Sequence, residues 1–144
     1  MTFIHVGHGL WYIFKISVKN DAGWSPERSV MYFTDPSIPS GAPINFIVKS
    51  KNSTSALLSW KPPGKWKRNG KIIGYELSYE KTGFSETKTV PIAETKRSYD
   101  VQGLQPFTTY HFWILAKTKI GSGPKERITV TTNEDGKTKL EIFS

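Results

Sequence analysis

An all-β sandwich of about seven short strands is the fold class that the sequence predicts, and two observations indicate it. Apolar and polar residues alternate with period two, most clearly in residues 72–80 and 110–118. Gly, Pro, Asn and Asp interrupt these runs at short intervals, and no segment shows sustained apolar spacing at the helical period. With 144 residues, 37% of them hydrophobic, the chain has the size and apolar content of about one such domain.

Each strand is expected where alternation runs between two turn signals. Residues 61–71 (KPPGKWKRNGK) are expected to form a loop because of their Pro pair and Asn-Gly step. The run Gly121-Ser122-Gly123 is expected to be a turn before the last strand. The expected strands are 44–48, 55–60, 72–80, 86–91, 98–101, 110–118 and 127–132.

Residues 12–34 match residues 110–132 at a constant separation of 98 residues. Tyr12 corresponds to Tyr110, and the match continues to Thr34 and Thr132. A separation near one hundred residues equals one sandwich domain with its linker, so we expect an internal repeat whose first copy is truncated. The chain is therefore expected to be a piece of a tandem array.

The domain organisation follows from this repeat. Residues 35–43 (DPSIPSGAP) carry three prolines and are expected to form a semi-rigid linker. Residues 1–11 show no counterpart to the sequence that leads up to Tyr110. The expected parts are the end of one domain at 1–34, the linker at 35–43, a complete domain at 44–133, and a tail or the start of a next segment at 134–144.

The complete copy resembles fibronectin type III repeats in residues that fall at the family's spacing. The resemblance covers residues 41–133, and residues 12–34 resemble the end of another repeat. It implies an immunoglobulin-like seven-strand β-sandwich with a tyrosine corner, in which the phenol of Tyr110 bonds back to nearby backbone. Thr118 stands where the family often has Asn. The matching residues are Trp60, Pro62, Pro63, Asn69, Gly70, Ile72, Tyr75, Leu77, Tyr79, Leu104, Pro106, Thr108, Tyr110, Phe112, Ile114, Ala116, Gly121 and Gly123.

The net charge of +8 is concentrated in residues 41–133, which hold 15 basic and 6 acidic residues. The resemblance places the 61–71 loop and the turn near Gly121 at one end of the sandwich. Clustered cations attract polyanions, and an exposed Trp can add a stacking anchor, so we expect a sulfated glycan or an acidic protein face as partner. The alternative is a solvated loop with Trp66 folded onto the sandwich. The expected docking residues are Lys65, Trp66, Lys67, Arg68, Lys71, Lys119 and Lys125.

Two further surface features are expected. His111, Trp113 and Leu115 should face outward from their strand and could form a protein contact; the alternative is that neighbouring side chains or the first copy cover them. Asn52-Ser53-Thr54 is an N-glycosylation sequon, and it lies in a predicted turn.

We expect no catalytic, cofactor-binding or metal site. The chain has no cysteine, which excludes disulfides and thiolate-ligated metals. His5 and His8 are three residues apart, but no third ligand is near them in the sequence. No Ser stands in a G-x-S-x-G motif.

The resemblance implies a non-catalytic module from the extracellular part of a single-pass cell-surface receptor or adhesion protein. It would recognise a protein or a glycan and space the array, next to neighbouring repeats. Nucleic acid and direct membrane contact are not expected partners, and any catalytic domain would lie elsewhere in the parent. The alternatives are a purely structural spacer, or a cytoplasmic repeat of a giant muscle-type protein.

Overall fold

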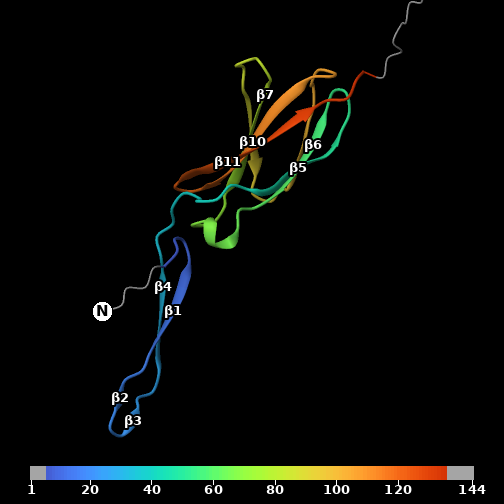
Figure 1. Cartoon of the computed structure of the whole chain (residues 1–144). Helices are drawn as coiled ribbons and strands as arrows, with labels where there is room; N and C mark the ends of the chain where they lie inside the picture. Colours follow the sequence, from blue (N-terminus) through green and yellow to red (C-terminus); the bar gives the residue numbers. More distant parts are fainter. Residues whose placement is uncertain (1–5, 136–144) are drawn as a thin grey trace, which may run out of the picture.

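The computed structural model describes residues 6–135, which form a β-sandwich and a hairpin that extends from one of its ends (Figure 1). The predicted all-β class is confirmed. One sheet has the strand order β11-β10-β7-β8, the other has the order β5-β6-β9, and neighbouring strands are antiparallel. The sandwich strands are β5 (Ile44–Lys51), β6 (Ala56–Lys61), β7 (Gly74–Lys81), β8 (Lys88–Ala93), β9 (Ser98–Val101), β10 (Thr109–Thr118) and β11 (Gly121–Thr131).

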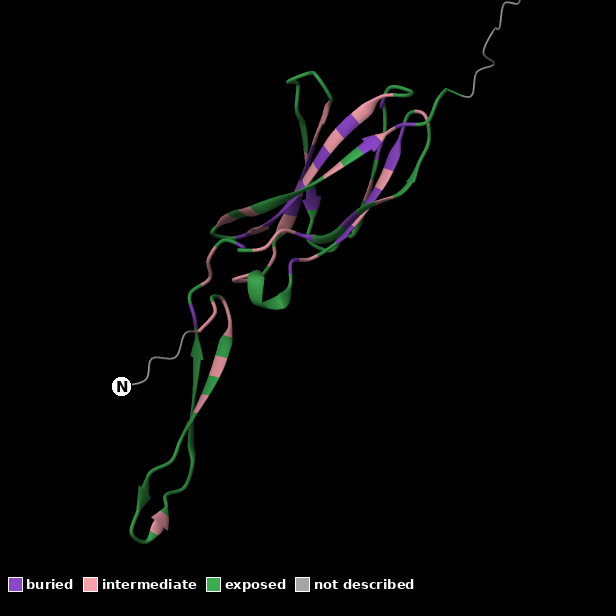
Figure 2. Cartoon of the chain, in the orientation of Figure 1, coloured by how far each residue is buried: buried purple, intermediate pink, exposed green. Residues whose placement is uncertain are grey.

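The core lies between the two sheets, and alternate residues of each strand form it (Figure 2). Phe112 and Ile114 of β10 are fully buried, and so is Leu58 of β6. The Trp60 ring contacts the Tyr75 ring across the sandwich at a centroid distance of 5.7 Å. Because the apolar residues recur with period two, each strand presents one side to this core, and burial of these large side chains drives its folding.

The last strand is longer than expected. β11 begins at Gly121, so Gly121-Ser122-Gly123 belongs to the strand and not to a turn. Thr118 pairs with Gly121, which leaves Lys119 and Ile120 as a two-residue turn. The prediction was wrong because β11 is an edge strand, where glycine and proline are tolerated and do not mark a strand end.

A second hairpin precedes the sandwich. Its main strands pair with each other, with Tyr12 opposite Tyr32, and most of its side chains are exposed (Figure 2). The register equals that of β10 and β11, where Tyr110 lies opposite Val130. The hairpin strands are β1 (Trp11–Ile16), β2 (Lys19–Asn20), β3 (Gly23–Trp24) and β4 (Arg28–Phe33).

Residues 6–11 repeat the backbone pattern of residues 104–109, contrary to the expectation that 1–11 has no counterpart. The Tyr12 phenol oxygen accepts a hydrogen bond from the Gly7 amide, as Tyr110 does from Gln105. Sequence comparison missed the match because a tyrosine corner consists of backbone bonds closed by one Tyr, so the residues between are free to differ. Residues 1–5 lie outside the described part of the chain.

The buried hydroxyl of a threonine closes each corner. Thr34 Oγ1 accepts from the Leu10 amide at 3.1 Å and donates to Gly7 O at 2.7 Å. Thr132 makes the equivalent bonds, with the Thr108 amide at 3.0 Å and with Gln105 O at 2.6 Å. The two corners are therefore alike in backbone and in side-chain chemistry.

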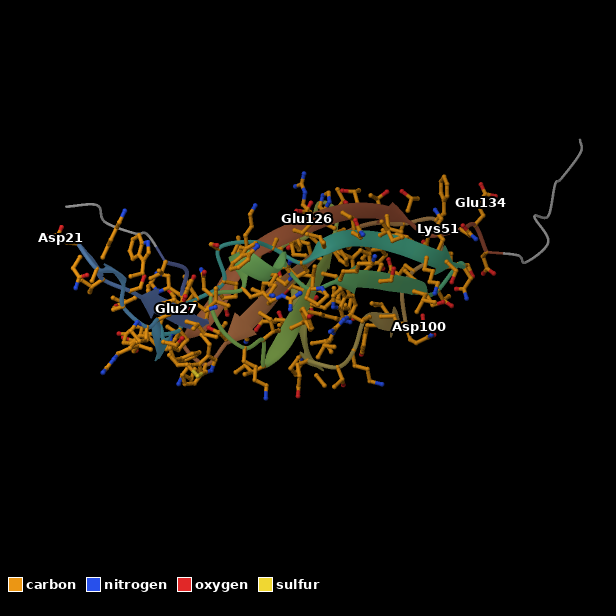
Figure 3. All side chains as sticks on the ribbon, turned by 90° about the horizontal axis from the view of Figure 1, so that it is seen from below. Asp21, Glu27, Lys51, Asp100, Glu126 and Glu134 are labelled. Atoms are coloured by element: carbon orange, nitrogen blue, oxygen red, sulfur yellow. The ribbon has the colours of Figure 1, made fainter. Side chains whose placement is uncertain are left out.

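The described molecule is elongated, with the hairpin turn at one end and the β5–β6 turn at the other. Figure 3 shows Asp21 at the far end of the hairpin and Lys51 near the opposite end of the sandwich. The segment between β6 and β7 and the β10–β11 turn lie at the sandwich end that faces the hairpin (Figure 1).

Candidate functional site

The segment between β6 and β7 forms an exposed basic tip. A single 3-10 turn, η1 (Lys65–Lys67), carries Trp66, whose side chain is 70% exposed. Lys65 Nζ lies 5.6 Å from the centroid of the Trp66 ring. The alternative in which Trp66 folds onto the sandwich is therefore wrong, and the indole and its neighbouring cations face solvent.

The other predicted docking residues lie in different surroundings. Arg68 is half-buried, and its Nε–H donates to Pro63 O at 2.8 Å. Lys71 and Lys119 line one small, mostly apolar hollow at the hairpin end of the sandwich. Lys125 lies further along β11, opposite Leu115. None of the six predicted cations takes part in the ion pairs recorded within residues 6–135, which are Lys15–Glu27 and Lys117–Glu76.

The basic tip also holds the linker. The Ser37 amide donates to Asn69 O at 2.7 Å, and Asn69 Nδ2–H donates back to Ile38 O at 3.0 Å. Thr118 Oγ1 donates to Ser37 O at 2.7 Å from the end of β10. The Ser40 amide donates to Lys67 O at 2.9 Å. These four bonds fix residues 37–40 to the sandwich.

Sequence reasoning missed Asn69 and Thr118 as linker-binding residues. A signal for Thr118 existed: it corresponds to Asn20 of the hairpin, and both side-chain oxygens accept from the amide two residues later. The bond from Thr118 to Ser37 spans 81 residues, which no local pattern reveals.

The end of the hairpin meets the same segment through two glycines. Gly9 has φ +64°, and a Cβ added there would lie 2.4 Å from Gly70 Cα and 2.7 Å from Asn69 O. Only glycine combines this left-handed backbone with so close an approach. The joint between hairpin and sandwich is therefore a backbone contact on one side and a hydrogen-bonded linker on the other.

The outer side of β10 is less exposed than expected. His111 and Trp113 are half-buried, but Leu115 is only 5% exposed, so the expected contact face is wrong at Leu115. β10 is flanked on both sides, and Leu115 lies opposite Glu76 of β7 and Lys125 of β11. The ion pair of Glu76 with Lys117, at 2.6 Å, holds side chains beside it. His111 Nδ1 lies 2.9 Å from Thr129 Oγ1.

A second basic feature, which sequence reasoning missed, surrounds Tyr75. This residue is 2% exposed, and its hydroxyl has no hydrogen-bond partner among the described residues. Burial raises the pKa of the Tyr75 phenol above 10.0, while the charges of Arg97 and Arg68 act in the opposite direction. The Arg97 guanidinium lies 5.6 Å from the centroid of the Tyr75 ring. The signal in the sequence was Lys96-Arg97 in a turn, but the alternation does not show that this turn adjoins Arg68.

Asn52 lies exposed in the turn between β5 and β6. Its Oδ1 accepts from the amides of Thr54 and Ser55, both at 2.8 Å. The residue is thus held in a short polar turn, with its side-chain oxygen engaged and its surface open.

Within residues 6–135 there is no group of three or more His, Cys, Asp or Glu side chains that could hold a metal ion. His8 Nδ1 lies 3.2 Å from Asp35 O, and His5 is outside the described residues. No helix in the described part of the chain is long and apolar enough to cross a membrane.

Comparison with known proteins gives one family profile, the fibronectin type III domain, which matches residues 41–132. The chain is 33% identical over 140 residues to the protein sidekick homolog of Caenorhabditis elegans, covering 90% of this chain and 6% of that protein. It is 34% identical over 116 residues to human receptor-type tyrosine-protein phosphatase F, covering 81% and 6%. For human neogenin the identity is 32% over 117 residues, covering 78% and 8%. The chain thus spans less than a tenth of each of these relatives.

Two solved structures share the fold. The FN1–FN3 domains of chicken CNTN1 superpose with a TM-score of 0.62 and 21% identity, covering 90% of this chain and 44% of that one. A redesigned β-sandwich protein superposes with a TM-score of 0.60 and 25% identity, covering 69% and 97%.

Proposed function

Because the chain belongs to the fibronectin type III family, we propose that it is a non-catalytic module from the extracellular part of a single-pass cell-surface receptor or adhesion protein. In this proposal residues 44–133 are one complete repeat, residues 35–43 are the linker, and residues 1–34 are the end of the preceding repeat. The matching tyrosine corners of Tyr12 and Tyr110 support this division. A receptor-type phosphatase among the relatives supports the extracellular setting.

The module's first role is to hold successive repeats at a fixed angle. The observation that carries it is the linker bound to the sandwich through Asn69 and Thr118. A proline-containing linker is already stiff. Its bonds to the sandwich, and the bond from the Gly9 amide of the hairpin to Asp35 O at 3.1 Å, remove its remaining freedom. In an array built from such joints, the orientation of each repeat relative to the next is fixed, as well as the spacing between them.

Distance distributions between two spin labels test this role. The chain lacks cysteine, so Ser29→Cys on β4 and Lys88→Cys on β8, both exposed positions, give one label pair across the joint. We expect one narrow distribution for the otherwise unchanged chain. Thr118→Val and Asn69→Gly should broaden it, since each removes a bond to the linker; Gly tolerates the φ of +57° at position 69.

The matched control is Thr89→Val, which removes a hydroxyl contact with Ser78 between β7 and β8 and leaves the joint intact. It should keep the narrow distribution. A broad distribution in the unchanged chain, or equal widths in all four proteins, would overturn the fixed-angle role.

A second role, recognition of a sulfated glycan or an acidic protein face, is favoured by the exposed Trp66 and the cations beside it. Lys65, Lys67, Lys71 and Lys119 are exposed and outside the ion pairs recorded for the described residues. Such cations release counterions on binding a polyanion, so retention on immobilised heparin should fall steeply with salt. Lys65→Ala with Lys67→Ala should elute at lower salt than the unchanged chain, and identical weak retention of both would reject this role.

The half-buried Trp113 and its neighbour His111 remain a proposed protein contact, now without Leu115. Asn52 remains a proposed glycosylation site.

A further inference from the structure

A hollow separates the β6–β7 segment from the turn between β8 and β9. It has a volume of about 380 Å³. We call it the Tyr75 hollow, and it is lined by Pro62, Arg68, Gly70, Lys71, Ile72, Tyr75, Glu94, Thr95 and Arg97.

Three of the lining side chains are cationic and one is acidic. Arg68 uses its Nε–H on Pro63 O, and Arg97 uses Nη1 on the carbonyls of Glu94 and Lys96. These backbone bonds orient both guanidinium groups, and no bond from their other nitrogens is recorded among the described residues. A guanidinium held in this way presents its remaining N–H groups as a preformed fork for an oxyanion.

The unpartnered Tyr75 hydroxyl is a further candidate donor. Tyr75 is 2% exposed and its hydroxyl is unpartnered within residues 6–135, which is costly for a buried polar group. The two charges that act on this phenol belong to Arg97 and Arg68, and both residues line the hollow. Tyr75 lines the hollow as well, and the Arg97 guanidinium lies 5.6 Å from the centroid of its ring. A ligand bound there would offer the phenol hydroxyl the partner that it lacks.

We propose that the Tyr75 hollow binds a tetrahedral oxyanion, the sulfate ester of a glycan, between Arg68, Arg97 and Lys71, with the Tyr75 hydroxyl as a fourth donor. This deepens the glycan-binding role and rests on it. The tip and the hollow are built from the same β6–β7 segment, which supplies Trp66 to one and Arg68 and Lys71 to the other. The cations of the tip would attract the sulfated glycan, and the hollow would bind one of its sulfate groups.

Titration calorimetry with a defined heparin tetrasaccharide tests the proposal on the whole chain. Tyr75→Phe removes one hydroxyl without changing shape, and we expect about fivefold weaker binding, the value of one hydrogen bond. Arg97→Gln should weaken binding about tenfold, since it removes a charge-assisted donor. Lys88→Gln, at the exposed start of β8, is the matched charge control and should change binding less than twofold.

The outcomes separate the hollow from the glycan-binding role itself. Suppose that Tyr75→Phe and Arg97→Gln bind like the unchanged chain, while the double variant Lys65→Ala with Lys67→Ala binds weakly. Binding in the hollow is then overturned, and glycan binding by the tip alone remains. If the unchanged chain does not bind the tetrasaccharide, the glycan-binding role fails and the hollow with it. A desulfated tetrasaccharide should not bind. If inorganic phosphate binds as tightly as the sulfated tetrasaccharide, the proposal that the ligand is a sulfate ester is overturned.

Folding controls keep this test sharp. Tyr75→Phe removes an unpaired buried hydroxyl, so its thermal midpoint should equal or exceed that of the unchanged chain. A weaker binder that is at least as stable supports a direct role of the hydroxyl. A loss of binding that merely follows a lower midpoint would overturn that role.

Discussion

Tyr12 and Tyr110, 98 residues apart, occupy the same place in two copies of one structural unit. Each phenol oxygen accepts a hydrogen bond from the amide five residues earlier, at 2.7 Å for Tyr12 and 2.9 Å for Tyr110. The surroundings differ: Tyr110 is 7% exposed inside the sandwich, whereas Tyr12 is half-buried on a hairpin whose side chains are mostly exposed. The corner is therefore a local device that forms the same bonds in both settings.

Tyr110→Phe should destabilise the sandwich. The Gln105 amide would lose its acceptor in a partly buried site, at a cost of about 1–3 kcal/mol. Urea unfolding followed by Trp fluorescence measures the change in midpoint. Tyr32→Phe, on the exposed hairpin, is the control and should leave the midpoint unchanged. An unchanged midpoint for Tyr110→Phe would show that the corner bond contributes nothing.

Gly9→Ala should weaken the joint without unfolding the sandwich. The new Cβ would meet Gly70 Cα, and alanine disfavours the φ of +64° by about 1 kcal/mol. Hydrogen exchange at the Ser37 and Ser40 amides, which donate to the β6–β7 segment, should become faster by about tenfold, the equivalent of 1.4 kcal/mol.

The control is Gly64→Ala, where a Cβ would meet nothing within 4 Å. Its Ser37 and Ser40 amides should exchange at the original rate. If these amides also exchange at the original rate in Gly9→Ala, the hairpin does not make the close contact with Gly70.

Ionisation of Tyr75 should make the sandwich sensitive to alkali. Its pKa is raised in the folded state because burial disfavours the phenolate, so the folded chain holds the proton more tightly than the unfolded chain. The contribution of the neutral Tyr75 phenol to the free energy of unfolding is fully present below pH 10.0. It falls as the pH rises above that value toward the pKa of the folded chain. Unfolding midpoints from about pH 8 to 11 should fall less for Tyr75→Phe than for the unchanged chain. If the curves of unfolding midpoint against pH are parallel for the two proteins, the pKa of Tyr75 is not raised by folding.

Asn52 should carry a glycan when the chain is made in a secretory pathway. The residue is exposed in a turn, which is what the modification requires. A mass loss on treatment with peptide N-glycosidase measures it. Thr54→Ala, which should abolish this mass loss, is a better control than replacement of Asn52. It removes the sequon while Asn52 keeps its bonds to the amides of residues 54 and 55. A native chain without glycan would argue against the proposed site.

The sequence predicted the sandwich well because its signals are local. Alternation located β6, β7 and β10 within a residue or two, and the constant separation of 98 residues found the repeated hairpin. It failed where a strand tolerates turn residues, at Gly121 to Gly123 of β11, and where backbone bonds carry the pattern, at residues 6–11.

The candidate site was only partly predictable. The loop composition singled out Trp66 and its lysines but left open whether the Trp66 ring is exposed or folded onto the sandwich. Leu115 was misjudged because its burial depends on neighbours in two other strands, and Arg97 was missed because only the folded sandwich sets it beside Arg68 and Tyr75. The linker bonds to Asn69 and Thr118 join residues 31 and 81 positions apart, a distance that no periodicity encodes.

Residual dipolar couplings of the backbone amides test the fixed joint most directly. Couplings from β1 and β4 of the hairpin and from β7 and β10 of the sandwich are measured on one weakly aligned sample. We predict that a single alignment tensor fits both sets, since the linker bonds and the Gly9–Gly70 contact hold the two parts as one body. Two tensors of different magnitude, with couplings near zero in β1 and β4, would contradict the account.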